Sequence, residues 1–310
     1  MSDFEHQSVL LAESLQALNI HPDGVYVDAT FGRGGHSRAI LQRLNEAGRL
    51  IALDQDPEAV AYAEHAFADE PRLTIEHCNF NQVADVIEKF NLSEKIDGVL
   101  MDLGVSSPQL DDAERGFSFL RSGPLDMRMD VSQGESAAQW LQKVKYADLV
   151  YVLRKYGEEK FAKRIAAAIV DRREQQEIVD TGDLAQIIAD AIPVKEKHKH
   201  PATRSFQAIR IVINKELQAI EEGLAAAATT LAVGGRLVVI SFHSLEDRIV
   251  KRFMRDISSR PKLPAGLPVM EADIEVPYKL VGKPLVASAG ELEVNPRARS
   301  ARLRVLERRL

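Results

Sequence analysis

Apolar and polar positions alternate in short blocks through the first hundred residues of the chain. Short apolar runs, each ending near a polar residue, predict strands over 25–29, 50–53, 73–77 and 98–101. Apolar residues at helical spacing predict helices over 6–19, 37–44, 57–67 and 83–90. Strands separated by helices at this rhythm indicate a parallel sheet with helical crossovers, so the fold class is α/β.

The rhythm breaks after residue 102, because the next clear strand is 236–240. Helical periodicity fills the interval, over 137–143, 147–155, 161–172 and 183–192. We therefore expect a core domain of residues 1–109 and 201–310, interrupted by an all-helical domain over 110–200. One long helix over 203–231 is expected to return the chain to the sheet. Segments 285–287 and 301–306 are expected to pair as an antiparallel edge.

Composition narrows the class of protein. A length of 310 residues allows a substantial core and two domains. The single cysteine, Cys78, excludes an internal disulfide framework and a cysteine-rich zinc site. The first residues do not resemble a signal peptide, and no apolar run is long enough to cross a bilayer. These features predict a cytoplasmic protein without a membrane partner.

The net charge of −6 argues against nucleic acid as a partner, but the positive charges are clustered. Three segments are basic, namely 195–210, 248–262 and 297–309. Each run alone is most simply a solvated face. Three runs on one chain indicate a track for phosphates as a second interpretation.

The segment Gly32-Arg33-Gly34-Gly35-His36-Ser37 is a glycine-rich turn between a strand that ends at Asp28 and a helix. The next strand ends at Asp54, about twenty residues beyond the glycines. Glycines let the backbone turn sharply and approach a ligand, and the acid can accept hydrogen bonds from both ribose hydroxyls. The pattern predicts a cofactor that contains a nucleoside, although such a turn can also be only a turn.

Three kinds of cofactor are considered for this turn. A nicotinamide or flavin site requires a third glycine where Ser37 stands, and a phosphate-binding P-loop requires a Gly-Lys-Ser or Gly-Lys-Thr sequence that is absent. S-adenosylmethionine requires a glycine turn for its amino-acid part and polar groups around its nucleoside. Four successive strands end in such groups, Asp28, Asp54, Asn79 and Asp102, which favours this donor over simple helix capping by the acids.

Longer blocks of the chain resemble the ribosomal RNA small-subunit methyltransferase H family, RsmH, also called MraW. The blocks occur in family order and occupy residues 6–10, 28–37, 54–57, 102–111, 115–119, 123–129, 200–211 and 241–248. One small departure is Ser205, where the family pattern has threonine.

The resemblance implies a Rossmann-like methyltransferase sheet with an inserted helical domain for substrate recognition. It implies transfer of a methyl group from S-adenosylmethionine to the N4 amino group of a cytidine in small-subunit (16S) ribosomal RNA. Carried over by position, the donor contacts are Gly34, Gly35, His36, Asp54, Phe80, Asp102 and Gln109. The RNA is expected within the assembled small ribosomal subunit, and a homodimer is compatible with the sequence.

The amino group of cytosine is a poor nucleophile, so its N–H groups need acceptors that turn the lone pair toward the methyl group. The Asp/Asn-Pro-Pro-aromatic motif of many amino methyltransferases is replaced here by Asp102-Leu103-Gly104-Val105. We therefore expect Asp102, Ser106 and Ser107 to take that catalytic role. No catalytic metal is expected, because His198 and His200 lack partner ligands nearby in sequence.

The target base must leave its stack to react, so aromatic and basic residues are candidates for contacting RNA. The candidates are Phe117, Phe119, Arg128, Arg204, Phe206, Arg210 and His243. Core packing, pairing with nearby acids and helix capping are the alternatives for the aromatic residues, the arginines and the histidine respectively. Two other functions stay open from the residues alone. One is an RNA-binding assembly factor without catalysis, and the other is a methyltransferase for another nucleic acid or a protein amine.

Overall fold

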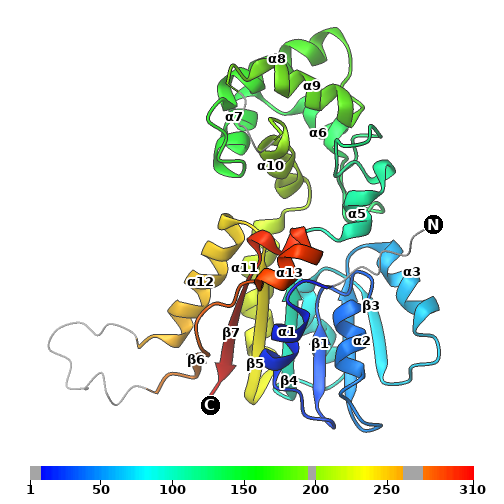
Figure 1. Cartoon of the computed structure of the whole chain (residues 1–310), viewed down its shortest axis with the longest axis vertical. Coiled ribbons are helices and arrows are strands. Elements are labelled where there is room, and N and C mark those ends of the chain that lie inside the picture. Colours follow the sequence, from blue (N-terminus) through cyan, green and yellow to red (C-terminus); the bar gives the residue numbers. More distant parts are fainter. Residues whose placement is uncertain (1–7, 195–199, 261–274) are drawn as a thin grey trace, which may run out of the picture. The chain divides into compact units, whose positions relative to one another are not determined.

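The computed structural model describes residues 8–194, 200–260 and 275–310, which form two compact units (Figure 1). The sheet unit comprises Met1–Gly104 and Leu217–Leu310, and the helical unit comprises Val105–Glu216. The predictions that involve His6, His198 and part of the basic runs (195–199 and 261–262) lie outside the described residues.

The sheet unit is built on a seven-stranded sheet with the order β3-β2-β1-β4-β5-β7-β6. Its strands are β1 (Val25–Asp28), β2 (Arg49–Asp54), β3 (Leu73–His77), β4 (Ile96–Asp102), β5 (Leu231–Ser241), β6 (Tyr278–Leu280) and β7 (Arg302–Arg308). Strands β1 to β5 pair in parallel, and β7 runs antiparallel to both β5 and β6. The predicted α/β sheet with an inserted helical segment is confirmed.

Both faces of this sheet are covered by helices, because both sets of alternating side chains are apolar. Tyr26 and Leu100 pack with α1 and α2 on one face, whereas Val27 and Val99 pack with α4, α11 and α12 on the other. The helices of this unit are α1 (Leu11–Leu18), α2 (Gly35–Leu41), α3 (Pro57–Ala66), α4 (Val83–Lys89), α11 (Glu216–Thr230), α12 (Ser244–Ser258) and α13 (Ala289–Val294). Among the described residues, no helix is both long enough and apolar enough to cross a membrane.

Two expectations about the ends of the sheet unit need correction. Of the helix expected over 6–19, α1 covers Leu11–Leu18, because Leu10 has a left-handed backbone (φ 51°) that the helix cannot include. The partner of β7 at the sheet edge is β6, which sequence reasoning missed. The expected segment 285–287 contributes a single bridge, in which Leu285 and Leu303 exchange two backbone hydrogen bonds. Pro284 has no N–H group with which to extend that ladder.

The helical unit packs its helices around a separate apolar cluster. Its helices are α5 (Ser107–Asp111), α6 (Ala137–Lys143), α7 (Tyr146–Lys155), α8 (Ala162–Gln175), α9 (Thr181–Ala191) and α10 (Thr203–Ile213). The cluster includes Leu141, Leu149, Ile165 and Ile188, all at most 1 % exposed. The helices expected between residues 137 and 192 are therefore present, each within a few residues of its expected bounds.

The single helix expected over 203–231 is wrong, since α10 and α11 are separate helices. Between them Lys215 has a left-handed backbone (φ 49°), and the side chain of Asn214 is held by the neighbouring segment. Its Nδ2 donates to the Met127 carbonyl at 2.8 Å, and its Oδ1 accepts from the Met129 N–H at 2.7 Å. Because α10 belongs to the apolar cluster of the helical unit, this unit reaches Glu216 and not residue 200.

Candidate active site

Three acids end neighbouring parallel strands of the sheet unit, Asp28 on β1, Asp54 on β2 and Asp102 on β4. The carboxyl ends of parallel strands form one edge, which is where open α/β sheets bind ligands. Asp28 is buried at 1 % exposure, and its carboxylate accepts hydrogen bonds from the Ser37 hydroxyl (2.6 Å) and the Thr30 N–H (3.2 Å). Asp28 therefore fixes both ends of the glycine turn to β1.

The glycine turn is folded so tightly that two of its residues have no room for a side chain. Gly34 has φ +72°, and a Cβ there would lie 2.7 Å from the ring of Phe31. A Cβ on Gly35 would lie 2.0 Å from the Ser8 hydroxyl. Only glycine fits these positions, which keeps the turn and the start of α2 close to the strand ends.

Asp54 is oriented by two backbone groups. Its Oδ2 accepts from the Gly32 N–H at 2.7 Å, and its Oδ1 accepts from the Asp56 N–H at 2.8 Å. Burial raises the pKa of Asp54 to about 6, although these two hydrogen bonds oppose the shift. Each carboxylate oxygen keeps a second lone pair, so the group can still accept two ribose hydroxyls.

Asp102 carries a buried oxygen without a hydrogen-bond partner in the described part of the chain. Its Oδ1 has no partner, and its Oδ2 lies 3.7 Å from Nε2 of His36. The His36 side chain is buried at 6 % exposure, and neither ring nitrogen makes a hydrogen bond to a described residue. Native proteins rarely leave such groups unsatisfied, so this edge is suited to receive polar groups of a ligand.

Burial shifts the pKa values of Asp102 and His36 in opposite directions. It raises the pKa of Asp102 well above its ordinary value, and the negative charges of Asp28 and Glu246 add to the shift. It lowers the pKa of His36, against the opposing effect of the Asp28 carboxylate. Both shifts favour the uncharged forms, so a cation placed here would restore the carboxylate of Asp102.

Phe80 follows β3 and begins the short 3-10 helix Phe80–Gln82. Its half-buried ring lies against Gly223 of α11, where a Cβ would be only 2.6 Å from the ring. Sequence reasoning singled out Phe80 but missed Gly223, because a glycine inside a helical pattern gives no sign of what packs on it.

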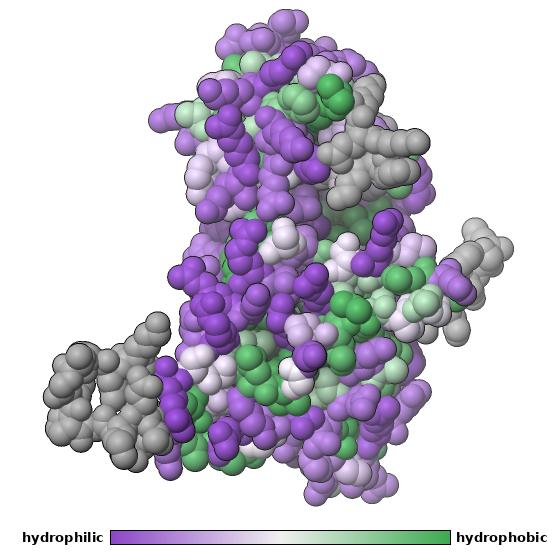
Figure 2. Space-filling model, turned by 60° about the vertical axis from the view of Figure 1, so that its left-hand side comes forward, coloured by the Kyte–Doolittle hydropathy of each residue, from purple (hydrophilic) through white to green (hydrophobic). Residues whose placement is uncertain are grey.

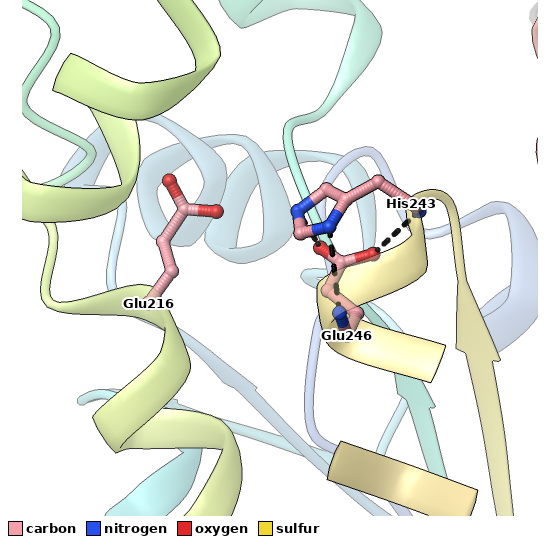
Figure 3. A group of neighbouring side chains, drawn as sticks. All are labelled: Glu216, His243 and Glu246. Carbon is pink, nitrogen blue, oxygen red and sulfur yellow. Dashed lines mark hydrogen bonds and ion pairs between the residues drawn. The ribbon is translucent and has the colours of Figure 1, made fainter. Parts of the chain in front are cut away.

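His243 stands two residues after the end of β5 and caps α12 (Figure 3). Its Nδ1 accepts from the Glu246 N–H at 3.4 Å, while Oε2 of Glu246 accepts from the N–H groups of Phe242 (2.7 Å) and His243 (3.1 Å). Nε2 of His243 lies 3.1 Å from Oε1 of Glu246. Glu246 is fully buried and acts on the pKa of Asp102, yet it was not predicted. A glutamate three residues into a helix is the signal that would have found it.

In the helical unit, Ser106 and Gln109 form a capping box at the start of α5. The Ser106 N–H donates to Oε1 of Gln109 at 2.9 Å, and the Gln109 N–H donates to the Ser106 hydroxyl at 3.5 Å. Ser107 is buried at 7 % exposure. The predicted contacts of these three residues with donor and base stay predictions, and the capping box supplies a structural role besides.

Two of the predicted RNA-binding arginines already have acidic partners. Arg128 makes two hydrogen bonds of 2.8 Å to Asp126, and Arg210 makes two of 2.8 Å to Glu216. Glu216, also drawn in Figure 3, thus pairs within its own unit. Arg204 lies half-buried on α10. The alternative interpretation for these arginines was pairing with acids, and Arg128 and Arg210 are paired in this way.

The three candidate phenylalanines differ in exposure. Phe117 and Phe206 are buried at 6 % and 4 % exposure, whereas Phe119 is half-buried. The Phe119 ring lies 4.8 Å edge-on from Phe206 and 4.5 Å from the exposed ring of His200. Base stacking stays a prediction, and Phe119 offers the most accessible ring of the three.

Comparison with known families decides the assignment. The model of the MraW methylase family matches residues 3–309. The chain belongs to the MraW methylase family. Its activity is therefore methyl transfer from S-adenosylmethionine to the N4 amino group of cytidine in ribosomal RNA, as the resemblance implied.

Solved structures with similar folds include a candidate rRNA methylase from Clostridium thermocellum, with TM-score 0.47 and 11 % identity over 98 % of this chain and 100 % of that one. An rRNA methylase from Streptococcus thermophilus has TM-score 0.44 and 10 % identity over 98 % of both chains. A methyltransferase homologue from Pyrococcus horikoshii has TM-score 0.44 and 11 % identity over 98 % of this chain and 67 % of that one. All three scores lie below 0.5, so the family match alone carries the assignment.

Proposed function

We propose that this enzyme binds S-adenosylmethionine at the carboxyl edge of β1, β2 and β4 and methylates its cytidine with Asp102 as the central catalytic group. The observation that carries the proposal is the buried Oδ1 of Asp102, which has no hydrogen-bond partner among the described residues. It stands beside the glycine turn and two further acids, on an edge suited to a cationic ligand.

The residues of this edge fit the donor, which supplies an activated methyl group on a positively charged sulfur. Gly34, Gly35 and the backbone of His36 would hold its amino-acid part, because a helix N-terminus presents free N–H groups to a carboxylate. Asp54 would accept the ribose hydroxyls through its two remaining lone pairs, and Phe80 would lie against the adenine. Gln109 of the helical unit would complete the donor contacts.

The chain's contribution to the chemistry is alignment and hydrogen bonding. A carboxylate at Asp102 can accept an N–H of the cytosine amino group and turn its lone pair toward the methyl group. Ser106 and Ser107 would supply further acceptors, and in-line alignment itself removes a large part of the barrier. The amino nitrogen loses a proton once it is methylated, and Asp102 is the acidic side chain whose raised pKa suits it to receive that proton.

The form of the RNA substrate, its contacts with the helical unit and the location of the enzyme are also part of the proposal. We take the substrate to be the small ribosomal subunit after assembly, because the large helical unit offers more surface than a short RNA requires. Phe119 and Arg204 would contact the RNA from that unit. Phe117, Phe206, Arg128 and Arg210 would do so only after leaving their present partners, and for Arg210 we expect the pair with Glu216 to persist. The single free cysteine agrees with a cytoplasmic location, and a homodimer stays part of the proposal from the sequence alone.

Transfer of a labelled methyl group tests the proposal directly. Naked 16S rRNA, isolated small subunits and whole ribosomes, all from cells that lack this protein, would be incubated with labelled donor. We expect label on cytidine N4 in small subunits, and none with Asp102→Ala protein that is shown to be folded. Donor binding without transfer to any of the three would support an assembly factor instead.

A further inference from the structure

One face of α12 is strongly basic. Arg248, Lys251, Arg252 and Arg255 are spaced i, i+3, i+4 and i+7, so they share one side of the helix, and all four are exposed. The opposite side carries buried residues of the core, such as Val250 and Met254. Figure 2 brings this side of the sheet unit forward and shows hydrophilic side chains over it. The four side chains span about 10 Å along the helix axis.

The strand β7 continues this basic face toward the active site. Asp247 of α12 joins the two elements, since it accepts from Arg304 at 2.7 Å and lies 3.8 Å from Arg302. Arg304 is mostly buried at 14 % exposure, whereas Arg302 is 55 % exposed. We call Arg248, Lys251, Arg252, Arg255 and Arg302 the basic strip.

The sheet register places one end of the basic strip beside the candidate active site. Arg302 pairs with Ser241 in the β5–β7 ladder, and the residue before Ser241, Ile240, pairs with Asp102 in the β4–β5 ladder. Arg302 therefore lies at the same carboxyl edge as Asp102, two strands away. The strip runs from this edge along the outside of α12.

The charges of the strip favour a polyanion. Carboxylates also contact the strip. Among the described residues, Asp247 lies 3.8 Å from Arg302, and Asp256 pairs with Arg255 at 2.7 Å and lies 3.9 Å from Arg252. The basic side chains outnumber these acids on a chain whose net charge is −6. Arginine-rich, extended surfaces bind phosphate backbones, and they do so without reading base sequence.

We propose that the basic strip binds the phosphate backbone of the ribosomal RNA that flanks the target cytidine. The proposal rests on the proposed function, because it assigns the RNA path of that same site. The strip would hold the RNA strand that leaves the active-site edge. It would contribute to RNA affinity and leave donor binding unchanged.

A charge-matched pair of variants tests this. The strip variant is Lys251→Gln/Arg252→Gln/Arg302→Gln. The control variant is Arg43→Gln/Arg49→Gln/Lys95→Gln, which removes three exposed charges near the opposite, amino-terminal edge of the strands. Both variants change the net charge equally. We would measure the KM for small subunits, the affinity for a 16S rRNA transcript between 50 and 300 mM salt, and the donor Kd by calorimetry.

We expect the strip variant to raise the KM for small subunits at least about tenfold. We also expect the slope of log RNA affinity against log salt concentration to become shallower by about 2, because each lost phosphate contact removes about 0.7 from that slope. The control variant should behave like the wild type, and the donor Kd should be the same in all three proteins. If the strip variant and the control variant had the same KM and the same salt slope, the proposal that the basic strip binds RNA would be overturned. A loss on small subunits without a change on naked rRNA would also overturn it, because the strip would then contact a protein. Absence of transfer by the wild type would instead refute the proposed function.

Discussion

Nε2 of His36 lies 3.7 Å from Oδ2 of Asp102, in a place where neither side chain has a hydrogen-bond partner among the described residues. The two groups come from different elements, α2 and β4, and the Asp102 N–H is tied to the glycine turn by a 2.7 Å hydrogen bond to the Thr30 hydroxyl. The turn that is proposed to hold the donor and the strand end that is proposed to hold the nucleophile are thus one connected structure.

Donor binding should release protons through Asp102. Burial holds the pKa of this carboxyl well above its ordinary value, and the positive charge of the donor should lower it again. Calorimetric titrations at neutral pH, in buffers with different ionisation enthalpies, should therefore show proton release on donor binding. The release should disappear in Asp102→Asn, and methyl transfer should fall about 100-fold or more. Equal proton release by the variant would assign the titrating group elsewhere.

Donor affinity should depend on pH through Asp54. The pKa of this residue is raised to about 6 in the free protein, and the carboxylate is the form that accepts both ribose hydroxyls. Affinity should therefore be level above pH 7 and weaken below pH 6, with Kd about tenfold higher at pH 5 than at pH 7. Asp54→Asn should bind the donor weakly and without this step. A pH step that persists in the variant would contradict the role of Asp54.

Gly223 should control the donor site through Phe80. An alanine at 223 would place its Cβ 2.6 Å from the Phe80 ring, which must then move. Loss of one aromatic stacking contact is worth about 1–3 kcal/mol, so the donor Kd should rise about tenfold. The Gly223→Ala/Phe80→Ala protein should bind no more weakly than Phe80→Ala alone. Additive losses would show that Gly223 acts by another route.

The sequence was sufficient to predict most of the sheet and the acids at its edge. A parallel sheet brings strand ends together by its geometry, so Asp28, Asp54 and Asp102 could be placed on one edge from the pattern alone. The alternating pattern over 301–306 also predicted the strand β7, but not its pairing with β5 and β6. The short strand β6 could not be found, because its three residues carry too little periodicity.

The contacts between side chains were harder to predict than the places of the residues in the fold. Arg210 was expected to bind phosphate, but its pairing with Glu216 depends on the break between α10 and α11. That break is fixed by side-chain contacts of Asn214 with a segment some 85 residues earlier. The place of Glu246 three residues into α12 marks it as a capping residue, but its burial beside the strand ends depends on tertiary packing. Periodicity and motif spacing record neither kind of contact.

The Arg210–Glu216 pair should stabilise the helical unit and should contribute little to RNA binding. Both side chains are mostly buried, with exposures of 14 % and 7 %, and the two hydrogen bonds between them are 2.8 Å long. Removing one partner leaves a buried charge uncompensated, which typically costs about 3–5 kcal/mol. Arg210→Gln should therefore lower the free energy of unfolding by about this amount in urea titrations.

The double variant Arg210→Gln/Glu216→Gln should recover much of that stability, because two amides can hydrogen-bond without a net buried charge. Its KM for small subunits should stay near the wild-type value, measured at a temperature where all variants are folded. A raised KM in the double variant, with stability recovered, would mean that Arg210 leaves Glu216 to bind phosphate. That outcome would restore the role expected from its position in the sequence.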